Sequence, residues 1–123
     1  MKKKILVADD DPALLQMMEA VLKREGYEVL TAHNGQEALN LVRQQAPDLM
    51  ILDIMMPKMD GPSVYSSLQS DVTLSKIPVI FLTALATSNS TSDEEGLLGT
   101  AAIMAKPVNH ATLLRKVSGL LGA

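Results

Sequence analysis

Short apolar runs alternate along the chain with segments whose apolar residues recur at helical spacing. An unbroken run such as Leu49–Leu52 is typical of a strand buried on both faces, as in a parallel sheet covered by helices. The pattern predicts five strands, the last of them the weakest, at residues 5–8, 27–32, 49–52, 78–82 and 101–105.

Most segments between the strands begin with a polar residue that can cap a helix. Asp11 followed by Pro12 predicts a first helix, which ends at Gly26. Asn34 with Glu37 three residues later has a capping-box pattern. The other predicted helices are residues 34 to about 45, 62 to about 70, a short one from residue 92, and 109–121.

Two of these segments differ in clarity. The last helix has Asn109 as its cap and one apolar face, made of Leu113, Leu114, Val117, Leu120 and Leu121. Residues 84–99 are the least decisive, because residues 87–91 have a polar loop composition and two glycines shorten the helix that Ser92 and Glu95 would cap.

Strands that alternate with helices predict an α/β fold, a doubly wound five-stranded parallel sheet with right-handed crossovers. The flavodoxin-like strand order 2-1-3-4-5 suits five strands, and one domain covers residues 1–123. This order makes the first and third strands neighbours. Polar residues at four strand ends then converge on one crevice: Asp9, Asp10, Asp53, Thr83 and Lys106.

Composition and charge exclude several classes of function. Without cysteine the chain has no disulfide, thiol nucleophile or thiolate metal site. A net charge of −3 weighs against nucleic acid as a direct partner. No segment is long and apolar enough for a signal peptide or a membrane span, so we expect a cytoplasmic protein without membrane insertion.

Asp53 has two interpretations, because Asp is common where a strand leads into a helix. It could be a helix cap. Pro57 and the turn-like pair Asp60-Gly61 favour a loop instead, with the next helix starting near Pro62. A site residue at the carboxyl end of the strand is therefore the favoured interpretation.

The predicted crevice suggests phosphoryl chemistry. Three carboxylates about 5 Å apart repel by about 3 kcal/mol per pair at an effective dielectric near 20, which a proton or a cation would relieve. A carboxylate-rich site without His or Cys suits Mg²⁺ or Mn²⁺. Thr83 can donate a hydrogen bond to phosphate and Lys106 can supply a positive charge, so Asp53 is a candidate nucleophile that forms an aspartyl phosphate.

These residues resemble the response-regulator receiver domain of two-component signalling, over the full length of the chain. The family's acidic pair matches Asp9 and Asp10, and its phosphoacceptor matches Asp53 within the specific motif D-I-M-M-P…D-G. Thr83 matches the switch hydroxyl and Lys106-Pro107 the Lys-Pro pair. The resemblance implies a cis bond before Pro107, and Mg²⁺ held directly by Asp10, Asp53 and the carbonyl of Met55, with Asp9 acting through water.

The resemblance also implies what the domain does. A sensor histidine kinase, a phosphotransfer protein or a small phosphodonor would phosphorylate Asp53, switching the surface around helix 4, strand 5 and helix 5 toward a downstream protein or self-association. The domain would be a signalling module, not an enzyme beyond its own phosphoryl transfer and autodephosphorylation, and either a single-domain regulator or an excised receiver. The chain departs from the family at Ile103, where an aromatic residue is usual, and in the Ser/Thr-rich loop after Thr83.

Three alternatives fit less of the sequence. A nucleotide- or flavin-binding module would need a glycine-rich turn after the first strand, where this chain has three aspartates. A haloacid-dehalogenase-like phosphatase could use Asp9 and Asp11, but it needs Thr or Val at position 13 and acidic residues after Lys106, which are absent. A vestigial interaction domain would not need every site residue. Asp11 is expected to cap its helix, and His33 and His110 to lie on the surface.

Overall fold

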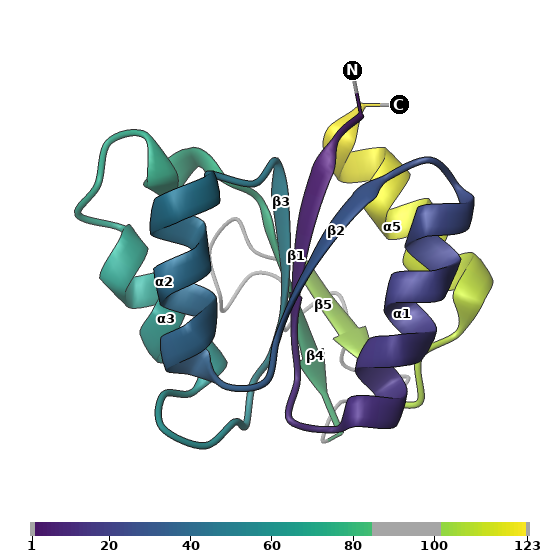
Figure 1. Ribbon diagram of the computed structural model, residues 1–123, viewed down its shortest axis with the longest axis horizontal. Coiled ribbons are helices and arrows are strands. Elements are labelled where there is room, and N and C mark those ends of the chain that lie inside the picture. The colour runs from purple at the N-terminus through teal and green to yellow at the C-terminus, as the bar shows by residue number, and fades with distance from the viewer. Residues whose placement is uncertain (1, 85–101, 123) are drawn as a thin grey trace.

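Five parallel strands form a central sheet in the order β2-β1-β3-β4-β5 (Figure 1). The computed structural model describes residues 2–84 and 102–122. The predicted α/β fold and its strand order are confirmed. The strands are β1 (Lys4–Ala8), β2 (Glu28–Ala32), β3 (Leu49–Asp53), β4 (Val79–Thr83) and β5 (Ala102–Ala105).

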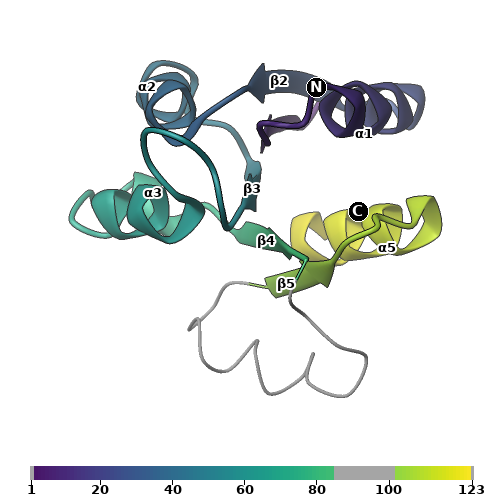
Figure 2. The ribbon, with the colours of Figure 1, turned by 90° about the horizontal axis from the view of Figure 1, so that it is seen from below.

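Helices cover both faces of this sheet. α1 (Pro12–Arg24) and α5 (His110–Leu121) lie on one face, and α2 (Gly35–Gln45) and α3 (Gly61–Leu68) lie on the other (Figure 2). Because neighbouring residues of a strand point to opposite faces, β1 supplies Ile5 and Val7 to one core and Leu6 and Ala8 to the other. β3 and β4 are buried along their whole length, as their unbroken apolar runs predict.

The three predicted helix caps that fall within the described residues are confirmed. The Asp11 carboxylate accepts a hydrogen bond from the N–H of Ala13 at 3.0 Å, and Asn34 Oδ1 accepts one from the N–H of Glu37 at 2.8 Å. Asn109 Oδ1 accepts the N–H of Thr112 at 3.0 Å. These side chains satisfy N–H groups that have no partner inside the helix, so each helix begins where its cap stands.

Several details differ from the prediction. α3 begins one residue early, at Gly61, because Asp60 caps it by accepting the N–H of Ser63 at 2.7 Å. The predicted connection at 71–77 contains a short 3₁₀ helix, Leu74–Lys76, whose start is fixed by the Asp71 carboxylate. On the predicted apolar face of α5, Leu113 and Val117 are buried but Leu120 is 38% exposed.

Part of the prediction lies outside the described residues. The short helix expected from Ser92 and the polar loop at residues 87–91 both fall between residues 85 and 101. Among the described residues, no helix has the length and apolar character that a membrane crossing requires.

Candidate functional site

The carboxyl ends of four neighbouring strands place polar side chains at one edge of the sheet. Asp53 and Thr83 are the last residues of β3 and β4, and Asp9 and Lys106 directly follow β1 and β5. The pairing of the strands continues into these positions, since the Asp9 N–H donates to Ala32 O at 3.1 Å and the Lys106 N–H to Thr83 O at 2.9 Å. The sheet itself therefore fixes the backbone of the site.

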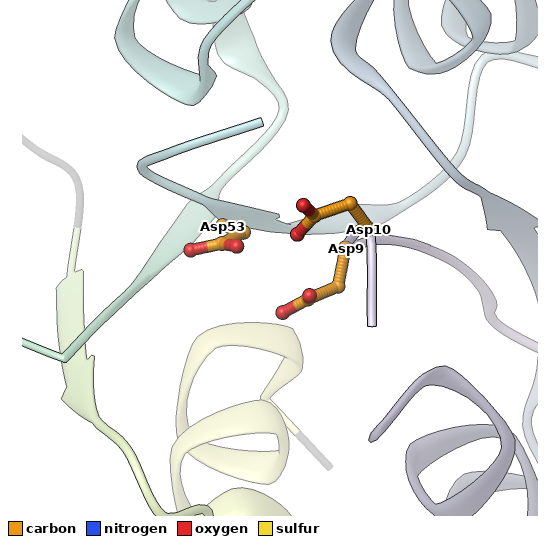
Figure 3. A group of neighbouring side chains, drawn as sticks. All are labelled: Asp9, Asp10 and Asp53. Atoms are coloured by element: carbon orange, nitrogen blue, oxygen red, sulfur yellow. The ribbon is translucent and has the colours of Figure 1, made fainter. Parts of the chain in front are cut away.

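Three carboxylates gather where β1 and β3 end (Figure 3). Asp9, Asp10 and Asp53 each offer an oxygen, and these oxygens all lie within 4.8 Å of one another. Asp9 and Asp53 are buried, whereas Asp10 is exposed. The convergence of these residues, which the strand order predicts, is thus observed.

Lys106 joins two of the carboxylates. Its ammonium Nζ lies 3.0 Å from Asp9 Oδ2 and 3.2 Å from Asp53 Oδ2. Asp9 Oδ1 accepts the N–H of Asp11 at 2.9 Å. The ammonium does not approach Asp9 Oδ2 in hydrogen-bonding geometry, so among the described residues this buried oxygen has a charged neighbour but no hydrogen-bond donor.

The backbone after β3 also faces Asp53. The N–H of Met55 points to Asp53 Oδ1 at 3.4 Å, longer than the usual N–H···O distance of about 2.7–3.2 Å. This bond is therefore weak, and Asp53 Oδ1 has capacity for another partner.

Burial and charge act together on the proton affinities of the site. Burial raises the pKa of the Asp53 carboxyl above its ordinary value of 3.8, and the negative charge of Asp9 raises it further. Lys106 and the Met55 N–H oppose this rise without cancelling it. For Lys106, burial alone would lower the pKa, but contact with the two carboxylates raises it overall, so the ammonium stays charged at neutral pH.

The residues present fit a divalent cation. Three ionised carboxylates and one ammonium leave a charge of −2 in a small space. Asp10 has no hydrogen bond or ion pair among the described residues, and the buried Asp9 Oδ2 lacks a donor. An all-oxygen donor set of this kind suits Mg²⁺ or Mn²⁺ and not a metal that prefers nitrogen or sulfur.

A cavity of about 200 Å³ opens beside the acidic cluster. Asp53, Thr83 and Lys106 line it, together with the residues that follow Asp53 and Thr83 in the chain, namely Ile54, Met55 and Ala84. Ile54 and Ala84 were not predicted, since no chemical signal distinguishes an apolar residue that only borders a site. The cavity gives a ligand access to both Asp53 and Lys106.

Two glycines matter to the site for reasons that the sequence alone does not show. A Cβ on Gly61 would lie 2.4 Å from the carbonyl oxygen of Asp53, and one on Gly35 would lie 1.7 Å from that of Met59. The sequence predicts Gly61 as a turn residue and as part of the motif around Asp53, but it gives no sign of the contact that Gly35 makes. Both glycines permit close backbone contact around the loop that follows Asp53.

Four further sequence predictions concern residues outside the three carboxylates. The bond between Lys106 and Pro107 is cis, as the resemblance implies. Asp11 caps α1, and its N–H also supports Asp9. His33 is exposed and lies 3.2 Å from Glu37, and His110 is exposed at the start of α5. Both histidines therefore lie on the surface, as the sequence predicts.

Comparisons with known proteins identify the family of the chain. A family model described as the response regulator receiver domain matches residues 5–118. The probable transcriptional regulator ycf27 of Cyanophora paradoxa is 41% identical over 122 residues, covering 98% of this chain and 48% of that protein. The chain spans about half or less of the length of the curated relatives it matches.

Solved structures give the same result. The chemotaxis protein CheY4 of Vibrio cholerae has a TM-score of 0.86 at 30% identity, covering 98% of this chain and 100% of that one. The receiver domain of the sensor histidine kinase PA1611 from Pseudomonas aeruginosa has a TM-score of 0.86 at 27% identity, with 100% of both chains covered. That crystal structure has a magnesium ion coordinated in its active-site cleft.

Proposed function

The chain belongs to the response regulator receiver domain family of two-component signalling, and from this premise we propose that it accepts a phosphoryl group on Asp53. The observation that carries the proposal is the position of Lys106, 3.2 Å from Asp53 Oδ2 and on the wall of the cavity that opens beside it. A nucleophilic carboxylate, a fixed cation and an open approach are together what phosphoryl transfer requires.

In the proposed reaction, an oxygen of the Asp53 carboxylate attacks phosphorus. The new O–P bond forms as the bond from phosphorus to the donor breaks, and the donor atom, an imidazole nitrogen or an acyl oxygen, keeps the electron pair. Lys106 stabilises the charge of the phosphoryl oxygens during the transfer and also favours the ionised form of Asp53, whose pKa burial raises.

The acidic residues divide into two roles toward the metal. Asp10, Asp53 and the Met55 carbonyl would hold Mg²⁺ or Mn²⁺ directly, with Asp9 acting through water, and the bound ion would supply further positive charge next to the phosphoryl oxygens. This division is supported by the surroundings of the two aspartates. Asp9 is buried against Lys106 and the Asp11 N–H, whereas Asp10 is exposed and has no competing partner among the described residues.

A phosphorylated histidine on a partner protein would be the donor. A groove of about 440 Å³ adjoins Lys106 and is lined mostly by the apolar side chains of α1 and of the segment before α5. Its residues are Asp11, Leu14, Met17, Lys106, Pro107 and Val108. The groove therefore offers a partner protein an apolar contact beside Lys106, which itself contacts Asp53. Such a donor meets the domain in the cytoplasm, where we place it.

The output would begin at Thr83. A phosphoryl group on Asp53 brings acceptor oxygens to the cavity that Thr83 lines, and Thr83 would donate to them and move the chain that follows β4. Ile103 is 3% exposed and packs in the same core as Phe81, its neighbour across β4 and β5. Because Ile103 is β-branched and stiff, the signal would pass through the backbone after Thr83 to the face that includes β5 and α5. The rest of that face lies outside the described residues.

Intact mass spectrometry tests the proposal directly. The protein is incubated with acetyl phosphate in Mg²⁺ or in EDTA, and the gain of one phosphoryl group is followed over time. We expect the gain in wild type with Mg²⁺ and in the control Asp48→Asn, which changes an exposed aspartate at the other end of β3. A comparable gain by Asp53→Asn would overturn the assignment.

A further inference from the structure

The first turn of α2 presses against the loop that follows Asp53. A Cβ built on Gly35 would lie 1.7 Å from the carbonyl oxygen of Met59, 2.5 Å from its carbonyl carbon and 2.7 Å from its Cβ. No real side chain can occupy this space, and the atoms it meets first are backbone. Neither the acidic cluster nor the cavity beside it includes any residue of α2, so the contact reaches the site only through the loop.

Short backbone contacts connect Met59 to Asp53 within this loop, residues 54–60. Gly61 donates its N–H to the carbonyl of Ile54 at 3.1 Å and lies directly against Asp53, where a Cβ would be 2.4 Å from the carbonyl oxygen. Met59 donates to Pro57 at 2.8 Å. A movement of Met59 is therefore passed to Gly61 and Ile54, and from there to Asp53 and Met55 on either side.

Of the two parts in contact, the loop is the easier to displace. α2 is held by Ala38, Leu39 and Val42, which are at most 4% exposed in the core under the sheet. The loop exposes most of its side chains to solvent, and Lys58 has a φ of 69°, a left-handed conformation that is unfavourable for lysine. Bulk added at position 35 should therefore move the loop and leave the helix in place.

We propose that Gly35 is a positioning residue for the metal and phosphoryl chemistry of Asp53. Its lack of a side chain lets α2 support the Met59 carbonyl, and this support sets the backbone that carries Asp53 and the Met55 carbonyl. The inference rests on the proposed function and deepens it, since it names a residue outside the site on which the Mg²⁺ ligands depend.

The test compares Gly35→Ala with a control in another helix. Gly119 lies in α5, and no described residue outside its own stretch of helix comes within 4 Å of a Cβ built on it, so Gly119→Ala adds a methyl group without a clash among these residues and should stabilise its helix. Because the chain contains no tryptophan, Mg²⁺ binding is followed by NMR titration of ¹⁵N-labelled protein. The phosphorylation rate is measured with acetyl phosphate, and unfolding by urea is measured on the same samples.

We expect Gly35→Ala to raise the Mg²⁺ dissociation constant by about tenfold or more, as loss of outer-shell support does, and to slow phosphorylation. In metal-free protein, the amides of Met55 and Gly61 should shift while that of Val42 stays unchanged. Gly119→Ala should bind Mg²⁺ like wild type. The double variant Gly35→Ala/Gly119→Ala should regain stability toward urea without regaining affinity.

Three results would overturn the inference. They are wild-type Mg²⁺ affinity in Gly35→Ala, recovery of affinity together with stability in the double variant, and failure of the double variant to fold. If wild type itself binds no Mg²⁺, the proposed function fails instead, and the metal-free shifts at Met55, Gly61 and Val42 still decide the role of Gly35.

Discussion

Replacing Asp53 with asparagine should stabilise the metal-free protein, although Asp53 is the proposed centre of its chemistry. The substitution keeps the size and shape of the side chain and removes one charge from a crowded cluster. At an effective dielectric near 20, carboxylate charges 4.8 Å apart, the largest separation among the three oxygens, repel by about 3.5 kcal/mol, and Asp53 has two such neighbours. Lys106 at 3.2 Å offsets about 5 kcal/mol of this repulsion.

The two repulsions together exceed the attraction of Lys106 by about 2 kcal/mol, and this net repulsion disfavours the charged form of Asp53. The burial of Asp53 acts in the same direction. Because Asp10 is exposed, solvent weakens its share of the repulsion. We therefore expect Asp53→Asn to raise the free energy of unfolding by about 1–2 kcal/mol in EDTA. Urea unfolding followed by far-ultraviolet circular dichroism measures this difference.

Magnesium should remove the advantage of the variant. At ten times its dissociation constant, Mg²⁺ adds about 1.4 kcal/mol to a protein that binds it only when folded, and Asp53→Asn lacks one of the proposed ligands. Asp48→Asn, distant along β3 from the cluster, should gain from Mg²⁺ as wild type does. A variant that is less stable than wild type in EDTA, or that gains equally from Mg²⁺, would refute the reasoning.

The same prediction has a pH dependence with a definite sign. Because the pKa of Asp53 is raised above 3.8, the folded protein takes up a proton at a higher pH than the unfolded chain does. The destabilisation by charged Asp53 is fully present above the raised pKa and is lost as the pH falls toward 3.8. In EDTA, the stability difference between Asp53→Asn and wild type should therefore shrink in that pH window, and a difference that grows there would contradict the assigned cause.

Three further predictions concern neighbouring residues. Asp10→Ala should weaken Mg²⁺ binding more than Asp9→Ala, because a direct ligand is lost, and calorimetric titration showing the opposite ranking would mean that the two roles are exchanged. Lys106→Met should slow phosphorylation and raise the pKa of Asp53 further, since Lys106 now lowers it, and a carboxyl ¹³C titration that shows a fall would contradict this. Asp60→Ala should lower the free energy of unfolding by about 1 kcal/mol, because α3 loses its N-cap. Gln69→Ala is the exposed control. Equal urea midpoints for the two variants would count against a stabilising role of the cap.

The sequence predicts most of the fold because its apolar runs and caps act locally. β3 and β4 are buried along their length as their unbroken runs indicate, and α1, α2 and α5 begin beside their predicted caps. The start of α3 was placed one residue late because Asp60 and Pro62 can each begin a helix. The 3₁₀ helix after α3 depends on one carboxylate, that of Asp71. No periodic pattern of apolar residues predicts so short a helix.

The gathering of polar residues at one edge of the sheet could be predicted, but not their contacts. Strand order alone brings Asp9, Asp53 and Lys106 to one edge of the sheet. That Lys106 lies within ion-pair distance of both carboxylates, and that Asp9 is fully buried, follows from side-chain packing that residue type does not reveal. The role proposed for Gly35 depends on a contact between segments more than twenty residues apart, Gly35 and Met59, and no local sequence pattern indicates that contact.

The location of the phosphoryl bond is the most direct test of the whole account. Protein phosphorylated with acetyl phosphate and Mg²⁺ is treated with borohydride, which reduces an aspartyl phosphate to homoserine, and the digest is mapped by tandem mass spectrometry. The account predicts homoserine at position 53 and at no other aspartate, with none formed in EDTA. Homoserine at position 9 or 10, or a phosphoryl group on His33 or His110 with Asp53 unmodified, would contradict it.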